Sequence, residues 1–383
     1  MTAPAPDMPP PRFIGSQIYA RPSYDGAHPL AIPRVPTVMA LARAMGWLPG
    51  SVYLTSPRAK PEALRTFHTR DYLDALLRAE TSQSLAPDDR ERHGLGTLSN
   101  PVHPLMYRRP ATAAGGSLLG AELIANGGVV YNPGGGTHHG HADRAGGFCY
   151  LNDPVLAIQR LRALGLSRVA YVDIDAHHCD GVEDAFVGDD AIRIVSIHEA
   201  KRWPFTGTVD DTAGGVAFNI PAPRGFNDTG FDYVLEDLIL PAVADHRPDA
   251  IVLQCGADAV LEDPLSRLAL SNGSHWRAVR ALGALAPRML VLGGGGYNPW
   301  SVGRLWTGVW ATLSGAEIPG PDDALPAEAQ QILRTLTWRR AAGRNPPEHW
   351  FTTLADHRRD GEIHPALRDT VTTLRKRTGA AGP

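Results

Sequence analysis

The side chains best suited to chemistry gather between His138 and Asp180, a segment that contains five of the fifteen histidines of the chain. Asp173, Asp175 and His177 are spaced two residues apart at the end of a short apolar run rich in β-branched residues. Residues two apart in an extended segment point to the same side, so these groups can face one crevice. A carboxylate and an imidazole placed this way form half of a site for a divalent metal ion. Such a site is catalytic when three protein ligands leave one position open, and structural when four ligands close it.

A second reactive pair, His138 and His139, follows three glycines. Glycine permits backbone conformations that other residues rarely adopt, so the chain can bring two adjacent imidazoles to one site. Each ring then needs a partner that fixes its tautomer, and Asp173 and Asp180 are the nearest spare carboxylates in the sequence. A single buried histidine is usually a core residue, and a strand-end aspartate often caps a helix. Five histidines around one predicted strand favour a functional site instead.

Two later segments carry further candidate groups, each directly after a predicted strand. Asp258 follows the apolar residues 250–253 and can supply a third metal ligand, although a helix N-cap is an equally good interpretation of this residue alone. Tyr297 follows four glycines at 293–296. Its phenol could donate a hydrogen bond to a developing oxyanion, whereas a tyrosine after glycines is more often structural. The glycine run is not a phosphate-binding loop, because no Lys and Ser or Thr follow it.

These groups must be positioned by the elements that the hydrophobic pattern predicts. Strands that alternate with helices predict an α/β fold with a mostly parallel sheet covered on both faces, and open sheets of this kind place their chemistry beyond the strand ends. The predicted strands are residues 13–19, 51–55, 128–131, 169–174, 192–198, 216–220, 250–255 and 289–292. The predicted helices are residues 36–47, one or two within 61–78, then 111–126, 154–164, 229–244, 274–286 and 302–313, with loops at 21–35 and 85–104.

The domain organisation predicted from the sequence is simple. The 383 residues are enough for one large α/β domain, and no internal repeat or clear linker divides them. We predict a disordered N-terminus at residues 1–12, the main domain at 13–320 and a C-terminal helical extension at 321–383 that packs on the outside of this domain.

Composition excludes several classes of partner. The formal net charge of -3 gives no electrostatic basis for non-specific nucleic-acid binding. The three cysteines (Cys149, Cys179 and Cys255) are odd in number and lack CxxC spacing, which argues against a disulfide framework and for a reducing compartment. Residues 1–11 lack the order of a signal peptide, and no apolar run approaches the ~18 residues that span a bilayer. We therefore expect a cytoplasmic protein with no nucleic-acid or membrane partner.

With these segments placed, the chain resembles the zinc-dependent histone deacetylase family, which includes bacterial acetoin-utilisation-type deacetylases and acetylpolyamine amidohydrolases. The resemblance extends from about residue 18 to residue 306 and implies a single-domain arginase/deacetylase-like fold in which long loops form the active site. The matching motifs, which are highly specific when found together in this order, are His138-His139, Gly147-Phe148-Cys149-Tyr150 with Asn152-Asp153, the run from Asp173 to Asp180, Gly256-Ala257-Asp258 and Gly295-Gly296-Tyr297.

The resemblance implies a catalytic role for each matching polar residue. Asp175, His177 and Asp258 resemble the zinc ligands, and iron(II) could occupy the same ligands. His138 and His139 resemble the paired general base and electrostatic or acid residue of the family. The carboxylate partners of these histidines and the phenol that polarises the substrate carbonyl match Asp173, Asp180 and Tyr297.

The resemblance also implies a tunnel for the acyl-lysine side chain. Phe148 and Phe205 resemble its two walls, and Gly147 matches the position whose carbonyl receives the substrate amide N–H. Arg34 resembles the arginine below the tunnel, and Thr137 stands where animal class I enzymes carry a bulky tryptophan. The smaller residue leads us to expect tolerance of acyl groups longer than acetyl. The inner monovalent-cation site of the family, usually a potassium site, matches the backbone around Asp173, Asp175, His177 and Ser196.

The function that the resemblance implies is removal of acetyl groups from the ε-amino group of lysine in proteins, by attack of a metal-activated water. An acetylpolyamine amidohydrolase is the main alternative, because the rim acid with which class I enzymes grip a peptide is not evident near Ser99. A catalytically silent acyl-lysine binding protein is an alternative of another class, although every catalytic position is filled. An arginase-type two-metal hydrolase fits less well, because only one set of ligands is visible. The oligomeric state stays open.

Overall fold

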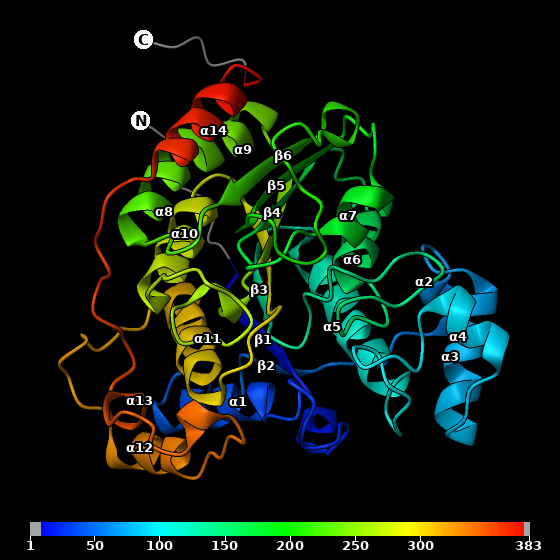
Figure 1. The fold of residues 1–383 in the computed structure, drawn as a ribbon, viewed down its shortest axis with the longest axis horizontal. Coiled ribbons are helices and arrows are strands. Elements are labelled where there is room, and N and C mark those ends of the chain that lie inside the picture. The colour runs from blue at the N-terminus through cyan, green and yellow to red at the C-terminus, as the bar shows by residue number, and fades with distance from the viewer. Residues whose placement is uncertain (1–8, 379–383) are drawn as a thin grey trace.

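The computed structural model describes residues 9–378 and contains one central sheet (Figure 1). Its eight strands pair in the order β2-β1-β3-β8-β7-β4-β5-β6, and every pairing between them is parallel. The strands are β1 (Arg12–Gly15), β2 (Tyr53–Thr55), β3 (Gly128–Asn132), β4 (Val169–Asp173), β5 (Ile192–Glu199), β6 (Ala217–Ala222), β7 (Ala250–Gln254) and β8 (Arg288–Leu292). The α/β fold with a parallel sheet is therefore confirmed.

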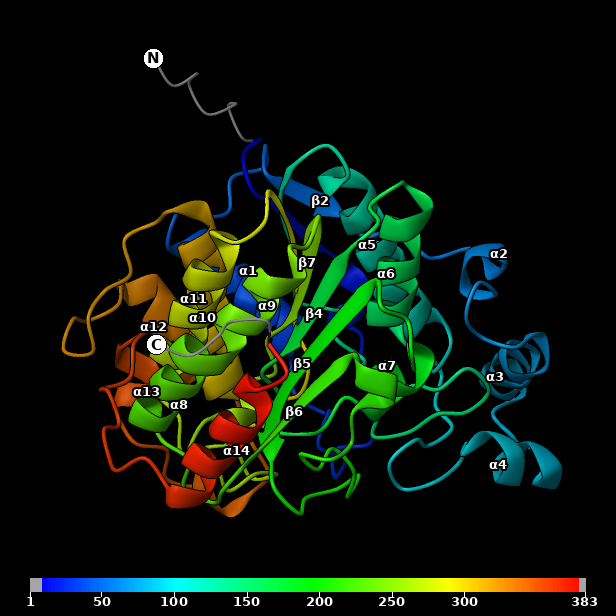
Figure 2. The ribbon, with the colours of Figure 1, turned by 90° about the horizontal axis from the view of Figure 1, so that it is seen from above.

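Helices cover both faces of this sheet (Figures 1 and 2). One face carries α5 (Arg108–Ile124), α6 (Asp153–Ala163) and α7 (Asp180–Ala185), and the short helices α2 (Pro61–Leu64), α3 (Arg70–Ser82) and α4 (Pro87–His93) lie outside α5. The other face carries α1 (Arg34–Ala44), α8 (Asp228–Val234), α9 (Leu240–His246), α10 (Asn272–Gly283) and α11 (Pro299–Ser314).

The central strands explain why the chain buries this sheet on both sides. All five residues of β4 and all five of β7 are buried. Ala170 and Val172 of β4 belong to the core beneath one helical layer, and Val169 and Tyr171 belong to the core beneath the other. Successive side chains of a strand point to opposite faces, so an uninterrupted apolar run supplies both cores at once.

Three sequence predictions need correction in detail. The predicted loop 85–104 contains α4, whose start at Pro87 and αL end at Gly94 are ordinary helix signals. The first predicted strand ends at Gly15, because a 3-10 turn (Gln17–Ala20) follows it. The predicted helix 229–244 is α8 and α9 joined through a π-helical turn at Leu235–Ile239. The segment 61–78, predicted to carry one or two helices, carries α2 and the start of α3.

The chain ends of the described part pack on the sheet domain. Arg12, within the segment predicted to be disordered, begins β1, whereas residues 1–8 of that segment lie outside the described residues. After α11 come α12 (Ala327–Arg334), α13 (His349–Thr352) and α14 (Pro365–Arg375). Buried Arg304 of α11 forms an ion pair with Asp356 at 2.7 Å, which ties this tail to the domain. The division at residue 320 stays a prediction. Between residues 9 and 378, no helix combines the length and apolar character that crossing a membrane requires.

Candidate active site

The candidate groups meet at the carboxyl ends of the central strands. Asp173 ends β4, and Asp175 and His177 lie in the loop that follows it. Asp258 lies in a 3-10 turn (Ala257–Ala259) after β7, which neighbours β4 in the sheet. Tyr297 follows β8, the neighbour of β7 on the other side. Because parallel strands end at one edge, loops far apart in the sequence deliver their side chains to the same place.

Three of these side chains form a compact, buried group. One ligand atom each from Asp175, His177 and Asp258 lies within 4.8 Å of the other two. His177 Nδ1 is 3.2 Å from Asp175 Oδ1 and 3.0 Å from Asp258 Oδ2. The second oxygen of Asp175 accepts hydrogen bonds from the Gln254 amide at 2.8 Å and from the Gly295 N–H at 2.7 Å. Asp258 Oδ1 accepts the Ala176 N–H at 2.9 Å, so both buried carboxylates are held by hydrogen-bond donors.

The surroundings of this group fit a divalent metal ion. Two carboxylates and one imidazole buried against each other leave an excess of negative charge that a cation can neutralise, and three such donors match the ligand number of a catalytic zinc site. Glycines surround the carboxylates closely. A Cβ atom at Gly256 would lie 2.0 Å from Asp175 Oδ2, and one at Gly295 would lie 2.1 Å from Asp258 Oδ2. Only residues without a side chain leave room for the carboxylates in these orientations.

The tandem histidines lie beside this group, and each has its own carboxylate. His138 Nδ1 is 2.8 Å from Asp173 Oδ2, and His139 Nδ1 is 2.7 Å from Asp180 Oδ1. Both rings are buried, and their centroids are 3.9 Å apart. A carboxylate at Nδ1 leaves Nε2 of each ring to take part in chemistry.

Their environments separate the two histidines electrostatically. Burial by itself lowers the pKa of His138, but the carboxylates of Asp173 and Asp175 outweigh burial and raise that pKa to about 9. Burial and the neighbouring His138 together lower the pKa of His139 to about 3, against the opposing effect of Asp180. Two adjacent imidazoles thus hold different protonation states at neutral pH, which is the arrangement that acid–base chemistry needs.

A pocket of about 240 Å³ opens onto this group. Its lining residues are Ser99, His139, Gly147, Phe148, His177, Arg202, Trp203, Leu265 and Tyr297. The rings of Phe148 and Tyr297 meet edge to face with centroids 5.6 Å apart. Burial, followed by the charges of Asp258 and Asp175, raises the pKa of Tyr297 well above its usual value, so its hydroxyl stays protonated and can donate a hydrogen bond.

The backbone at the pocket wall requires glycine at one position. Gly147 has a φ of +48°, and a Cβ there would lie 2.5 Å from both the His139 ring and the Trp203 ring. Phe148 also has a positive φ of +68°, which is uncommon for a bulky residue. Backbone conformations of this kind persist at functional sites where the surroundings enforce them.

Comparison with known proteins identifies the family. A family model described as the histone deacetylase domain matches residues 28–313. The chain belongs to the histone deacetylase family. It is 32% identical over 330 residues to the acetoin utilization protein AcuC of Bacillus subtilis. The matched segment covers 82% of this chain and 84% of AcuC. It is also 35% identical over 293 residues to histone deacetylase RPD3 of Saccharomyces cerevisiae, and this match covers 74% of this chain and 67% of RPD3.

Solved structures agree with this assignment. An HDAC homologue from Aquifex aeolicus is 34% identical and has a TM-score of 0.91, with 96% of this chain and all of that chain covered. An HDAC homologue in complex with SAHA is 35% identical, with the same TM-score and the same shares covered. The family resemblance and the arginase/deacetylase-like fold inferred from the sequence are thus confirmed. Membership of this family makes the chain a deacetylase, a hydrolase that acts on acetylated substrates.

One predicted pocket residue of this histone deacetylase family member lies elsewhere. The side chain of Phe205 is 73% exposed and does not line the pocket. Trp203 lines it instead, with its ring centroid 4.6 Å from that of His139. The prediction of Phe205 as the second wall is therefore corrected to Trp203. The segment after β5 is irregular, so no periodicity in the sequence indicates which aromatic residue turns inward.

The other predicted positions lie around the pocket without lining it. Arg34 is half-buried, donates from Nη1 to the Gly294 carbonyl at 2.6 Å and lies over the Trp306 ring. The Thr137 hydroxyl donates to the Leu151 carbonyl at 2.6 Å and therefore turns away from the pocket. Ser196 is the partner of Asp173 across the β4–β5 register.

Sequence reasoning missed several residues that hold the site together. The buried carboxylate of Asp263 accepts hydrogen bonds from the Tyr297 N–H at 2.7 Å and from the Leu265 N–H at 2.9 Å. The Tyr171 hydroxyl donates to Asp173 at 2.5 Å. Gln254 is a polar residue at the end of the apolar strand β7, and this pattern could have indicated that its amide holds a site residue, as it does with Asp175.

Proposed function

We propose that this deacetylase is zinc-dependent and removes acetyl groups from the ε-amino group of lysine in proteins. The observation that carries the proposal is the convergence of the Asp175–His177–Asp258 group, the paired imidazoles and a pocket of about 240 Å³ at one edge of the sheet. Two carboxylates and an imidazole suit zinc. The same donors accept iron(II), so the metal loaded depends also on availability.

The chain's own residues supply the proton transfers. Zinc held by Asp175, His177 and Asp258 would polarise the amide carbonyl and acidify the attacking water. His139 faces Asp180 with Nδ1, so its neutral ring can accept the proton of the attacking water at Nε2. The same ring can then pass a proton to the departing amine.

The neighbouring groups stabilise the charge that develops. His138, paired with Asp173, holds a proton beside His139 and so opposes negative charge at the reacting carbonyl. The protonated hydroxyl of Tyr297 lines the pocket and can donate to the carbonyl oxygen as its charge grows. Each histidine–carboxylate pair thereby has a separate task, which we expect to contribute of order 10²-fold or more in rate.

The pocket lining favours an acyl-lysine side chain over an acetylated polyamine. Phe148 and Trp203 offer ring surfaces to an aliphatic stem. Among the described lining residues none is Asp or Glu, and the charged one is Arg202, which is paired with Glu199. A polyamine carries further ammonium groups that such a rim leaves without a counter-charge, whereas a peptide does not need one.

Three finer features belong to the same proposal. We infer tolerance of acyl groups longer than acetyl, because the small Thr137 directly precedes the histidine pair, of which His139 lines the pocket, and its hydroxyl is taken up by the Leu151 carbonyl. We infer a structural potassium ion around Asp173, Asp175, His177 and Ser196, which lie together at the ends of β4 and β5. We also propose residues 13–320 as the catalytic domain, with 321–383 as its extension.

Substrate profiling of the purified protein tests the proposal. Release of the free amine, which every one of these amides yields on hydrolysis, would be compared among acetyl-, butyryl- and longer acyl-lysine peptides and acetylated polyamines, with the Tyr297→Phe variant as a control for the catalytic chemistry. Faster turnover of acyl-lysine peptides, lost in the variant, is the expected result. Faster turnover of polyamines would favour the polyamine alternative. Peptide binding without hydrolysis by the zinc-loaded protein would instead identify an acyl-lysine binding protein.

A further inference from the structure

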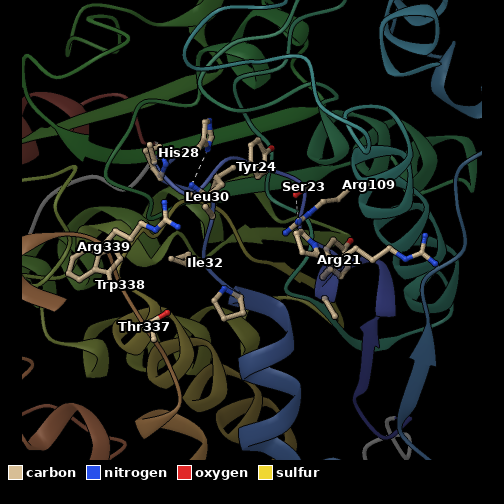
Figure 3. A pocket seen from close by; sticks show the side chains of 18 of the residues that line it. Arg21, Ser23, Tyr24, His28, Leu30, Ile32, Arg109, Thr337, Trp338 and Arg339 are labelled. Carbon is tan, nitrogen blue, oxygen red and sulfur yellow. Dashed lines mark hydrogen bonds between the residues drawn. The ribbon is translucent and has the colours of Figure 1, made fainter. Parts of the chain in front are cut away.

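A second, larger cavity of about 610 Å³ lies apart from the pocket of the proposed reaction. It is bounded by the loop of residues 19–33, by Arg109 of α5 and by residues 337–340 of the tail (Figure 3). Its volume lies in the range of sites for small molecules. No residue that we place in the metal group, the tandem histidines or the acyl-lysine pocket lines it.

The charge of this cavity is one-sided. Four arginines line it, namely Arg21, Arg109, Arg339 and Arg340, and none of its described lining residues is Asp or Glu. Within residues 9–378, none of these four forms an ion pair with a carboxylate. Asp25 belongs to the same loop, but its carboxylate accepts the Ala27 N–H at 2.7 Å and does not line the cavity. An arginine cluster without counter-charges is an electrostatic site for an anion.

The arginines come from elements that are far apart in the sequence. Figure 3 shows Arg109 and Arg339 on opposite sides of the loop that carries Leu30 and Ile32. Arg109 donates one hydrogen bond to Ser23 Oγ at 2.6 Å and lies over the Tyr19 ring, which leaves most of its five N–H donors for a ligand. The Arg339 guanidinium lies against Gly26, where a Cβ would approach Nη1 to 2.4 Å. Arg109 is half-buried and Arg339 is exposed, and neither pairs with a carboxylate among the described residues.

Aromatic rings and an unused hydroxyl complete the lining. Tyr24 already lies against the rings of His28 and His103, with centroids 4.2 and 4.5 Å away, whereas Trp338 meets Trp300 edge to face and is half-buried, so the indole of Trp338 is the ring surface that the lining offers. The hydroxyl of buried Tyr19 has no hydrogen-bond partner among the described residues. An indole surface beside several guanidinium groups suits a ligand that joins a planar ring to more than one phosphate, because arginine binds phosphate oxygens in a bidentate way and stacks with planar rings.

We propose that this cavity binds a nucleoside polyphosphate. Several phosphates match several unpaired arginines, whereas a monocarboxylate would neutralise only one of them. The planar base would lie against the aromatic side of the lining. His28 separates this cavity from the proposed active site, since its ring lines the cavity and meets Phe148 edge to face at 4.9 Å.

Calorimetric titration of the metal-loaded protein tests this proposal without any deacetylation assay. The probes are magnesium-saturated ATP, which does not strip the metal, then pyrophosphate and adenosine. We expect one ATP per chain, weaker binding of pyrophosphate and still weaker binding of adenosine. The Arg339→Gln/Arg340→Gln double variant should bind ATP at least about tenfold more weakly, because it removes two cations from an exposed segment without cutting into the core.

The matched control is Arg344→Gln, which removes an exposed cation from the same tail outside the cavity. Its affinity for ATP should stay within a factor of about two of the unaltered protein. No binding of ATP at millimolar concentration, equal losses in the control and the double variant, or adenosine binding as tightly as ATP would each overturn the proposal.

Discussion

At the scale of single residues, the chemistry depends on hydrogen-bond partners more than on the reactive groups alone. His138 and His139 have the same side chain, yet the carboxylates of Asp173 and Asp175 raise the pKa of His138, whereas burial lowers the pKa of His139. Similarly, Tyr297 keeps its proton because it is buried near two carboxylates. The position of each group therefore fixes the role that we propose for it.

The hydroxyl of Tyr297 should act on the rate rather than on binding. We expect Tyr297→Phe to lower kcat by about 10²- to 10³-fold on acetyl-lysine peptides with little change in KM, because the lost donor acts on the developing oxyanion. Steady-state kinetics would measure this. A variant with unchanged kcat and an unchanged melting temperature would contradict the role of this phenol.

Trp203 and Phe205 provide a matched pair for testing the pocket wall. Trp203→Ala should raise KM for acetyl-lysine peptides about tenfold, since it removes a ring that lines the pocket. Phe205→Ala removes a ring that is 73% exposed and outside the pocket, so its KM should stay close to that of the unaltered protein. An unchanged KM in Trp203→Ala together with a raised KM in Phe205→Ala would identify Phe205 as the pocket wall instead.

At the scale of elements, the loop that carries the tandem histidines is held by the start of α6. Asn152 caps α6 by accepting the Val155 N–H at 3.0 Å, and its amide donates to the Gly140 carbonyl at 2.8 Å. The Asn152 N–H in turn donates to Nε2 of buried His68, between α2 and α3. A neutral ring at His68 is therefore part of the scaffold of the site.

This arrangement predicts a loss of stability in acid. Burial lowers the pKa of His68 to about 4, against 6.5 in the unfolded chain. The unfolded state then binds more protons between these values, so the stability that the neutral ring provides is complete above about pH 6.5 and falls as the pH drops towards 4. His68→Gln cannot titrate, so its loss of stability between pH 7 and pH 5, measured by urea unfolding, should be about 2 kcal/mol smaller. An equal loss in both proteins would contradict this account.

The elements were largely predictable from the sequence, and the loops were not. The central strands are short, uninterrupted apolar runs rich in β-branched residues, and Asp175, His177 and Asp258 lie within four residues of the ends of two of them. Trp203 and Asp263 were not predicted, because their roles depend on tertiary contacts in irregular segments. Helix α4 was missed within a polar stretch, although its proline start and glycine end were present.

At the scale of the whole molecule, loops from β4, β5, β7 and β8 and the segment at 134–149 meet around one buried group of acids. Uncompensated buried charge destabilises a fold, so metal binding and stability should be linked. Chelation should lower the melting temperature, and added zinc should restore it, with a stabilisation of about 2.7 kcal/mol at zinc concentrations 100 times the Kd. Thermal unfolding would measure both effects, and an identical melting temperature with and without metal would contradict the linkage.

The most direct test is a zinc titration of the metal-stripped protein, followed by acetate release from an acetyl-lysine peptide. Our account predicts that activity rises in proportion to added zinc and levels off at about one ion per chain, because three donors form a single site. The Asp258→Asn variant should stay inactive throughout. Full activity before any metal is added, or an active Asp258→Asn variant, would contradict the proposed metal centre.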